Sequence, residues 1–238
     1  MKPLLLLKVG HTLSSLSATR GDYEVWFGAG LGVGDALHVV RVTEGEPLPD
    51  LNAYRGVVVS GSAAMVTERA AWSVSTAAWL LAAIASDLPV LGVCYGHQLL
   101  ADALGAQVDW NPRGRQIGSV VATLTETGRA DPLFSGLPPR LQVQTSHSQS
   151  VLALPESLAL LAETPRDPRH AFRVRGARAW GVQFHPEFDA EVTRAYIRER
   201  SAEIRAEGQD PDALINGVVE SAHGDIILRR FAALSAIS

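Results

Sequence analysis

Short apolar segments and one long helical segment alternate along the first 95 residues. Largely apolar runs occupy 3–9, 36–43, 56–60 and 88–93, with Gly, Pro or Asp at their edges. Runs this short and continuous are typical of strands that are covered on both faces. Residues 69–86 are rich in alanine and too long for a strand, so they predict a helix. This alternation predicts βαβ units and a mostly parallel, right-handed sheet.

The pattern changes after about residue 107. Five strand-like segments follow one another with turn residues between them: IGSVVATL, LQVQTS, SLALLAET, HAFRVRG and AWGVQF. We interpret them as antiparallel strands added to the parallel core. Two helical stretches, roughly 189–207 and 211–235, are separated by the turn-forming EGQDP. Since no repeat or linker is visible, we expect a single domain over 1–238, with a core of about 1–190 and a helical extension of about 191–238.

Composition and charge narrow the classes of partner. The chain has 238 residues, 47% of them hydrophobic, which is enough for a substantial core. The formal net charge of −4 gives no support for a nucleic-acid or membrane surface, because both select clustered positive charge. The apolar run at 3–9 is too short for a signal or spanning segment. A single cysteine cannot form an internal disulfide, which favours a reduced, cytoplasmic protein. We expect no metal site and no cofactor, since the sequence has no Cys pair and no His-x-x-x-His spacing.

The only cysteine, Cys94, lies where an apolar strand gives way to a helical pattern, in GVCYGHQLL. Gly-x-Cys-x-Gly at such a junction has the layout of a nucleophile elbow, in which flanking glycines allow close approach of neighbouring backbone. The elbow would put the sulfur near a helix N-terminus, which favours the thiolate, and would point the Tyr95 amide toward an oxyanion. The alternative is a small buried apolar residue, and the motif alone supports both interpretations equally.

A nucleophilic cysteine requires a base, and His185 is the strongest candidate. It ends the apolar segment AWGVQF, and Glu187 follows two residues later. In an extended chain, residues two apart share a face, so Glu187 could orient the imidazole toward the sulfur. A lone histidine after a buried strand is more often a capping or core residue, but the acid and the upstream elbow favour catalysis. The order Cys, His, Glu also differs from that of α/β-hydrolases, where the acid precedes the histidine.

Together, GVCYGHQLLADALGA and GVQFHPEF resemble the class I (triad) glutamine amidotransferase family over about residues 50–190, and most of all its stand-alone GMP synthase-type members. This resemblance implies an α/β fold with a flavodoxin-like, mostly parallel sheet flanked by helices, and an antiparallel flank. It also implies that Cys94 attacks the side-chain amide of L-glutamine, giving a γ-glutamyl thioester and ammonia. His185 would then transfer protons while Glu187 orients its ring.

The resemblance also implies binding residues. The backbone amides of Gly61 and Tyr95 would form the oxyanion hole. Gln116 stands where many relatives have glutamate, and its neutral amide can accept a hydrogen bond from a substrate ammonium but cannot form a salt bridge. The expected substrate-binding residues are Gln98, Gln116, Ser146, His147 and Ser148. Alternatives remain for two of them, since Gln98 could be a solvated helix residue and His147 an ordinary loop residue.

Three functions are compatible with these residues. The first is an amidotransferase subunit that supplies ammonia to a separate synthase in trans, because the sequence lacks the Ser-Gly-Gly-x-Asp-Ser loop of an ATP pyrophosphatase domain. The second is an autonomous hydrolase or peptidase acting on a γ-glutamyl compound. The third, a non-catalytic regulatory protein with the same fold, is the least favoured because the Cys-His-Glu set is intact.

Overall fold

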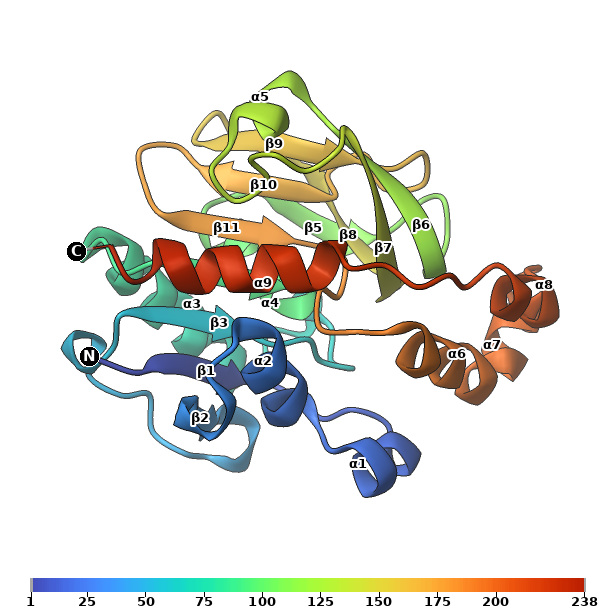
Figure 1. The fold of residues 1–238 in the computed structure, drawn as a ribbon, viewed down its shortest axis with the longest axis horizontal. Helices are drawn as coiled ribbons and strands as arrows, with labels where there is room; N and C mark the ends of the chain where they lie inside the picture. Colours follow the sequence, from blue (N-terminus) through green and yellow to red (C-terminus); the bar gives the residue numbers. More distant parts are fainter. Residues whose placement is uncertain (1, 238) are drawn as a thin grey trace.

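A nine-stranded mixed sheet organises residues 2–237, the residues that the computed structural model describes (Figure 1). The strand order is β2-β1-β3-β4-β11-β10-β9-β6-β7. The parallel part contains β1 (Leu4–Lys8), β2 (His38–Arg41), β3 (Gly56–Val59), β4 (Val90–Val93) and β11 (Ala179–Val182). The antiparallel part contains β6 (Gln116–Leu124), β7 (Arg140–His147), β9 (Leu158–Glu163) and β10 (Ala171–Val174). The predicted mostly parallel sheet with an antiparallel flank is therefore confirmed.

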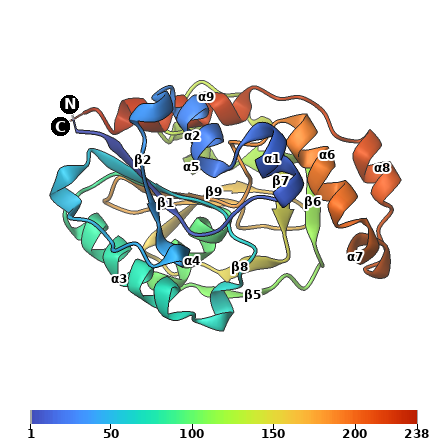
Figure 2. The ribbon, with the colours of Figure 1, turned by 90° about the horizontal axis from the view of Figure 1, so that it is seen from below.

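Helices cover both faces of the parallel part. In Figure 2, α2 (Tyr23–Leu31) and α9 (His223–Leu234) lie on one face, while α3 (Ala71–Ala85) and α4 (Tyr95–Ala103) lie on the other. In β1, Leu4 and Leu6 join the hydrophobic cluster beneath α2 and α9, whereas Leu5 and Leu7 join the one beneath α3 and α4. This double burial explains the continuous apolar runs. Within 2–237, no helix is long and apolar enough to span a bilayer.

The strand β11 corrects the expectation that AWGVQF is one of the antiparallel strands added to the parallel core. It pairs antiparallel with β10 but parallel with β4, so that Ala179 lies opposite Val90 and Val182 opposite Val93. An apolar run buried on both faces does not reveal its direction, because direction depends on which strands it meets in space. The parallel pairing brings the residues that follow β4 and β11 to the same edge of the sheet.

The C-terminal region is divided into more helices than the two that the sequence predicts. It forms α6 (Ala190–Glu199), α7 (Ser201–Ala206), α8 (Pro211–Asn216) and α9. Gly217 and the β-branched residues after it are poor helix formers. The backbone of Val219 also binds side chains of the sheet, since its N–H donates to Ser119 Oγ and its carbonyl accepts from Gln144 Nε2.

The predicted SHSQS loop is a tight corner between two strands. The strand β7 runs as far as His147, and β8 (Gln149–Ala153) begins after Ser148. The sequence analysis did not identify β8, or β5 (Gln107–Trp110), which pairs with it in a small antiparallel sheet. The chain also forms two short helices, α1 (Ser14–Arg20) and α5 (Glu126–Ala130).

Candidate active site

Cys94 occupies the single residue between β4 and α4. Its φ of 51° and ψ of −99° fall in a region that residues with a side chain rarely adopt. Two backbone hydrogen bonds hold this conformation: Cys94 N donates to Val182 O at 2.9 Å, and Cys94 O accepts from Gln98 N at 3.1 Å. This strand, strained turn and helix form the elbow that the sequence predicts.

The two glycines flanking Cys94 are sterically required. A Cβ on Gly92 would lie 2.6 Å from the carbonyl carbon of Gly96 and closer still to its oxygen. A Cβ on Gly96 would lie 2.6 Å from Val59 O. Because these neighbours are backbone atoms of the sheet and the helix, they cannot rotate away, which confirms the expected close approach.

His185 and Glu187 lie together just beyond β11. The distance from His185 Nδ1 to Glu187 Oε1 is 2.7 Å, and their side chains are 3% and 0% exposed. The His185 ring stacks on Phe188 with centroids 4.0 Å apart, and its backbone N–H donates to Gln144 O at 2.8 Å. The imidazole is thus held by the carboxylate and by the Phe188 ring, and the backbone that carries it is fixed to β7.

The position of Gly61 shows that the sulfur, the imidazole and the predicted oxyanion loop converge. A Cβ on Gly61 would be 2.8 Å from His185 Cε1, 3.2 Å from Tyr23 Oη and 3.7 Å from Cys94 Cβ. Cys94 Sγ itself points toward Ser146 O, 3.8 Å away. The segments after β3, β4 and β11 and the end of β7 therefore meet at one edge of the sheet, where open α/β sheets bind ligands.

The charge state of His185 favours a reactive sulfur. Burial lowers its pKa, but the charges of Glu187 and Cys94 outweigh burial and raise the pKa to about 10. His185 is then an imidazolium at neutral pH, donating from Nδ1 to Glu187 and leaving Nε2–H for the site. An imidazolium beside a thiol stabilises the thiolate.

This raised pKa predicts that stability depends on pH. A histidine whose folded pKa exceeds its unfolded value of about 6.5 contributes stability that is fully present below that value and is lost as pH rises through about 10. We expect the free energy of unfolding to fall over this window, by up to about 1.4 kcal/mol per pH unit. Urea denaturation between about pH 6.5 and 10 measures it.

The pH dependence of the free energy of unfolding is best measured in the Cys94→Ser variant, because there no thiol titrates and contributes to the change. There Glu187 still raises the pKa of His185, and the added substitution Glu187→Gln removes that cause. The double variant should show the smaller fall. Equal falls in both proteins would contradict the assignment of an imidazolium–carboxylate pair.

Two cavities adjoin Cys94. The smaller, of about 50 Å³, is lined by Gln98, Ser146, His147 and Ser148, together with Cys94 and residues 62–65. The larger, of about 270 Å³, is lined by Thr12, Tyr23, Glu199 and His185 among others. Cys94 and Ser146 border both. The smaller cavity therefore gathers four of the five residues that sequence analysis assigned to substrate binding.

The side chains of Gln98 and Gln116 both make hydrogen bonds to other residues of the protein. Gln98 Nε2 donates to Gln149 O at 2.7 Å and to Gln183 Oε1 at 2.9 Å, which leaves only its side-chain oxygen for a ligand. The Gln116 side chain is buried beside His147 and Thr164. It is not among the described residues that line either cavity. Direct contact of Gln116 with substrate thus stays a prediction.

Sequence analysis missed two arginines that line the smaller cavity. Arg115 is held by Glu203 at 2.8 Å and Glu207 at 2.9 Å, and Arg200 follows the end of α6. The described lining of this cavity contains no carboxylate, but Glu203 and Glu207 offset the charge of Arg115 from outside it. The position of Arg115 beside Gln116 offered a signal, but nothing in the sequence places Arg200 at the site.

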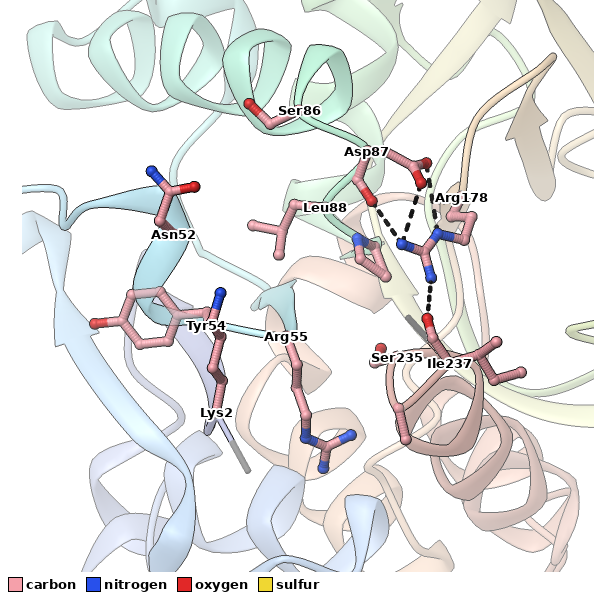
Figure 3. A pocket seen from close by; sticks show the side chains of 12 residues that line it. Lys2, Asn52, Tyr54, Arg55, Ser86, Asp87, Leu88, Arg178, Ser235 and Ile237 are labelled. Carbon is pink, nitrogen blue, oxygen red and sulfur yellow. Dashed lines mark hydrogen bonds and ion pairs between the residues drawn. The ribbon is translucent and has the colours of Figure 1, made fainter.

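A separate hollow of about 430 Å³ is remote from this chemistry. Lys2, Tyr54, Arg55 and Ser235 line it, and Figure 3 shows Arg178 beside it, bound to Asp87 and to the carbonyl of Ile237. Its lining residues precede β1, β3, β4 and β11 or follow α9, whereas Cys94 follows β4. It therefore lies at the opposite ends of the strands and contributes nothing to the site at Cys94.

Comparison with known proteins agrees with this geometry. The family model for glutamine amidotransferase class-I matches residues 30–203. GMP synthase [glutamine-hydrolyzing] of Porphyromonas gingivalis is 37% identical over 138 residues, covering 58% of this chain and 26% of that protein. The corresponding enzyme of Bacteroides fragilis is 32% identical over 200 residues, covering 74% and 38%. The chain thus spans about a quarter to two fifths of the length of these relatives.

A solved structure extends the likeness to the whole chain. The crystal structure of a glutamine amidotransferase from Thermotoga maritima aligns over 100% of both chains with a TM-score of 0.78 and 20% identity. At this identity the likeness shows a shared fold, including the parts outside residues 30–203.

Proposed function

Because this chain belongs to the class I glutamine amidotransferase family, we propose that it hydrolyses the side-chain amide of L-glutamine at Cys94 to give glutamate and ammonia. The observation that carries the proposal is the strained Cys94 elbow beside a buried imidazolium at His185. A thiolate paired with an imidazolium provides a nucleophile and a proton donor in the same site.

In the proposed reaction, the Cys94 thiolate attacks the side-chain carbonyl carbon of glutamine. The carbon–nitrogen bond breaks as His185 donates its proton to the leaving nitrogen, and ammonia and a γ-glutamyl thioester result. Neutral His185 then removes a proton from water, whose oxygen attacks the thioester carbon and displaces the sulfur. Glu187 orients the imidazole in both steps, and the sum is glutamine plus water to glutamate plus ammonia.

The backbone amides of Tyr95 and Gly61 are the proposed oxyanion donors. Tyr95 begins α4, and the first N–H groups of a helix have no partner within it. Gly61 supports the assignment by its closeness to Cys94 and His185, which leaves no room for a side chain.

We further propose that the ammonia serves a separate synthase. The matched relatives are GMP synthases in which the similar segment is only part of a longer protein. By analogy, ammonia formed at Cys94 would be passed to a synthase site formed by other residues.

A second candidate function, hydrolysis of a larger γ-glutamyl compound, is favoured by the cavity of about 270 Å³ that borders Cys94. Ammonia as a leaving group needs no space of this size, whereas a peptide-sized leaving group does. Ser14, at the start of α1, lines this cavity and is exposed enough to accept a larger side chain.

Release of ammonia and glutamate by the purified chain separates the two functions. We expect Cys94-dependent ammonia from L-glutamine, with Cys94→Ser as the blank. A γ-glutamyl dipeptide is assayed in parallel, and kcat/KM about tenfold higher for the dipeptide would assign the hydrolase function instead. The absence of Cys94-dependent glutamate from both substrates, with no thioester adduct by mass spectrometry, would contradict catalysis.

A pair of variants tests the role of the larger cavity. Ser14→Trp should fill it and lower dipeptide turnover more than glutamine turnover. Thr19→Trp, on the exposed side of the same helix and outside the described cavity lining, is the matched control and should affect neither.

A further inference from the structure

Three side chains with metal-binding atoms lie close together behind the corner between β7 and β8. They do not include Cys94, His185 or Glu187. His147 ends β7, while Asp167 and His170 lie between β9 and β10. Asp167 Oδ2 is 3.7 Å from His147 Nε2 and 3.5 Å from His170 Nδ1, and all three side chains are buried. One ligand atom from each residue lies within 4.8 Å of the other two. The residues come from two segments, so a search for closely spaced ligands in the sequence does not find them.

The tautomer of His147 leaves a lone pair facing the carboxylate. His147 Nδ1 is 2.9 Å from Gln149 O, and since a carbonyl only accepts, Nδ1 carries the hydrogen. In this tautomer the neutral ring has its lone pair on Nε2, which lies toward Asp167 Oδ2 and toward Gln116 Oε1 at 3.3 Å. Three electron-rich atoms facing one another are mutually repulsive unless a positive charge lies between them.

His170 provides an independent indication. Its side chain is fully buried, and neither ring nitrogen makes a hydrogen bond of acceptable geometry. Within residues 2–237, the ion-pair partners of Asp167 are only His147 and His170, so no Lys or Arg neutralises this buried carboxylate. Buried polar groups are nearly always paired, so a buried imidazole with two unpaired nitrogens, beside a carboxylate that no Lys or Arg neutralises, indicates a missing ligand.

We propose that a divalent transition-metal ion of the Zn²⁺ type binds between His147 Nε2, Asp167 Oδ2 and His170 Nδ1. Two histidines and a carboxylate are a common donor set for zinc. Tetrahedral ligands about 2.0–2.1 Å from zinc lie about 3.4 Å apart, so the separations of 3.5 and 3.7 Å need to contract by only a few tenths of an ångström. Gln116 Oε1, beside His147 Nε2, is a candidate for the fourth ligand.

The surroundings of the site match those of a structural metal centre. A metal-bound histidine usually donates its other ring N–H to a carbonyl or carboxylate, as His147 does to Gln149 O. Asp167 is oriented by Ser150 Oγ at 3.1 Å and by Arg169 N at 3.2 Å. The ion would brace the corner whose Ser146 carbonyl faces Cys94, so it would hold the substrate site in place without touching the reacting atoms.

The metal content of the purified protein tests this proposal. The chain is expressed without a histidine tag in zinc-supplemented medium, washed with chelator, and analysed by mass spectrometry of the elements. We expect about one zinc per chain in the unmodified protein and in the control His38→Gln, whose histidine is exposed on β2. His170→Gln and Asp167→Asn should retain less than about a tenth of that amount.

Two further measurements keep the test decisive if a variant does not fold. Protein produced with Co²⁺ instead of zinc should show the visible d–d absorption of a tetrahedral site, and zinc should raise the melting temperature of the unmodified protein. Less than about a tenth of an equivalent of zinc in that protein, with no cobalt spectrum, would overturn the proposal in favour of a proton shared within the cluster. Equal zinc in His170→Gln would also overturn it. Because the readout is metal content, the result does not depend on the proposed amidase activity.

Discussion

Cys94→Ser is expected to lower kcat for glutamine hydrolysis by about 10⁴-fold or more. A serine hydroxyl is not ionised near neutral pH and needs a neutral base to take its proton. His185 cannot serve as that base, because Glu187 remains in the variant and continues to favour the imidazolium. The imidazolium–carboxylate pair of His185 and Glu187 can therefore stabilise a thiolate but cannot activate a serine hydroxyl.

The measurement is steady-state ammonia release, with the melting temperature as the control for folding. Serine occupies nearly the volume of cysteine, and the backbone hydrogen bonds from Cys94 N and to Cys94 O do not involve the side chain. Stability should change little. Activity within about tenfold of the unmodified protein would remove Cys94 from the role of nucleophile.

Gly92→Ala is expected to lower the free energy of unfolding by about 3 kcal/mol or more. The new Cβ would lie 2.6 Å from the Gly96 carbonyl carbon and 2.8 Å from His97 N, and closer still to Gly96 O. These atoms form the first turn of α4, so relief requires the helix to move away from β4. That movement would open the elbow, and activity should fall together with stability.

The matched control is Gly217→Ala at the end of α8. There a Cβ would meet Ala213 O at 3.4 Å and Leu214 O at 3.5 Å, and the φ of −80° suits any residue. We expect a change within about 0.5 kcal/mol. Urea denaturation of both variants decides the matter, and similar losses in the two would show that close approach at Gly92 is not the cause.

Much of the fold was predictable because its signals are local. The runs at 3–9, 56–60 and 88–93 became β1, β3 and β4, and the alanine-rich segment became α3. The glycines around Cys94 indicated the elbow, since only close backbone approach requires them on both sides. The pair His185 and Glu187 followed from the two-residue period of an extended chain.

Other features were not encoded locally. The direction of β11 depends on its pairing with β4, and the break before α9 depends on the binding of Val219 to side chains of β6 and β7. The burial of Gln116 beneath His147 depends on the pairing of β6 with β7. In each case the deciding partner lies far away along the chain.

The sequence by itself determined the parallel core, the Cys94 elbow and the pairing of His185 with Glu187, because steric limits and strand periodicity act over a few residues. Only the tertiary structure decided the rest: the approach of Arg200 to the smaller cavity, the second cavity at Cys94, and the cluster of His147, Asp167 and His170. These features arise when strands and helices distant in sequence pack together. Their physical basis is the low dielectric of the interior, where charges and lone pairs that would be independent in water must be matched to one another.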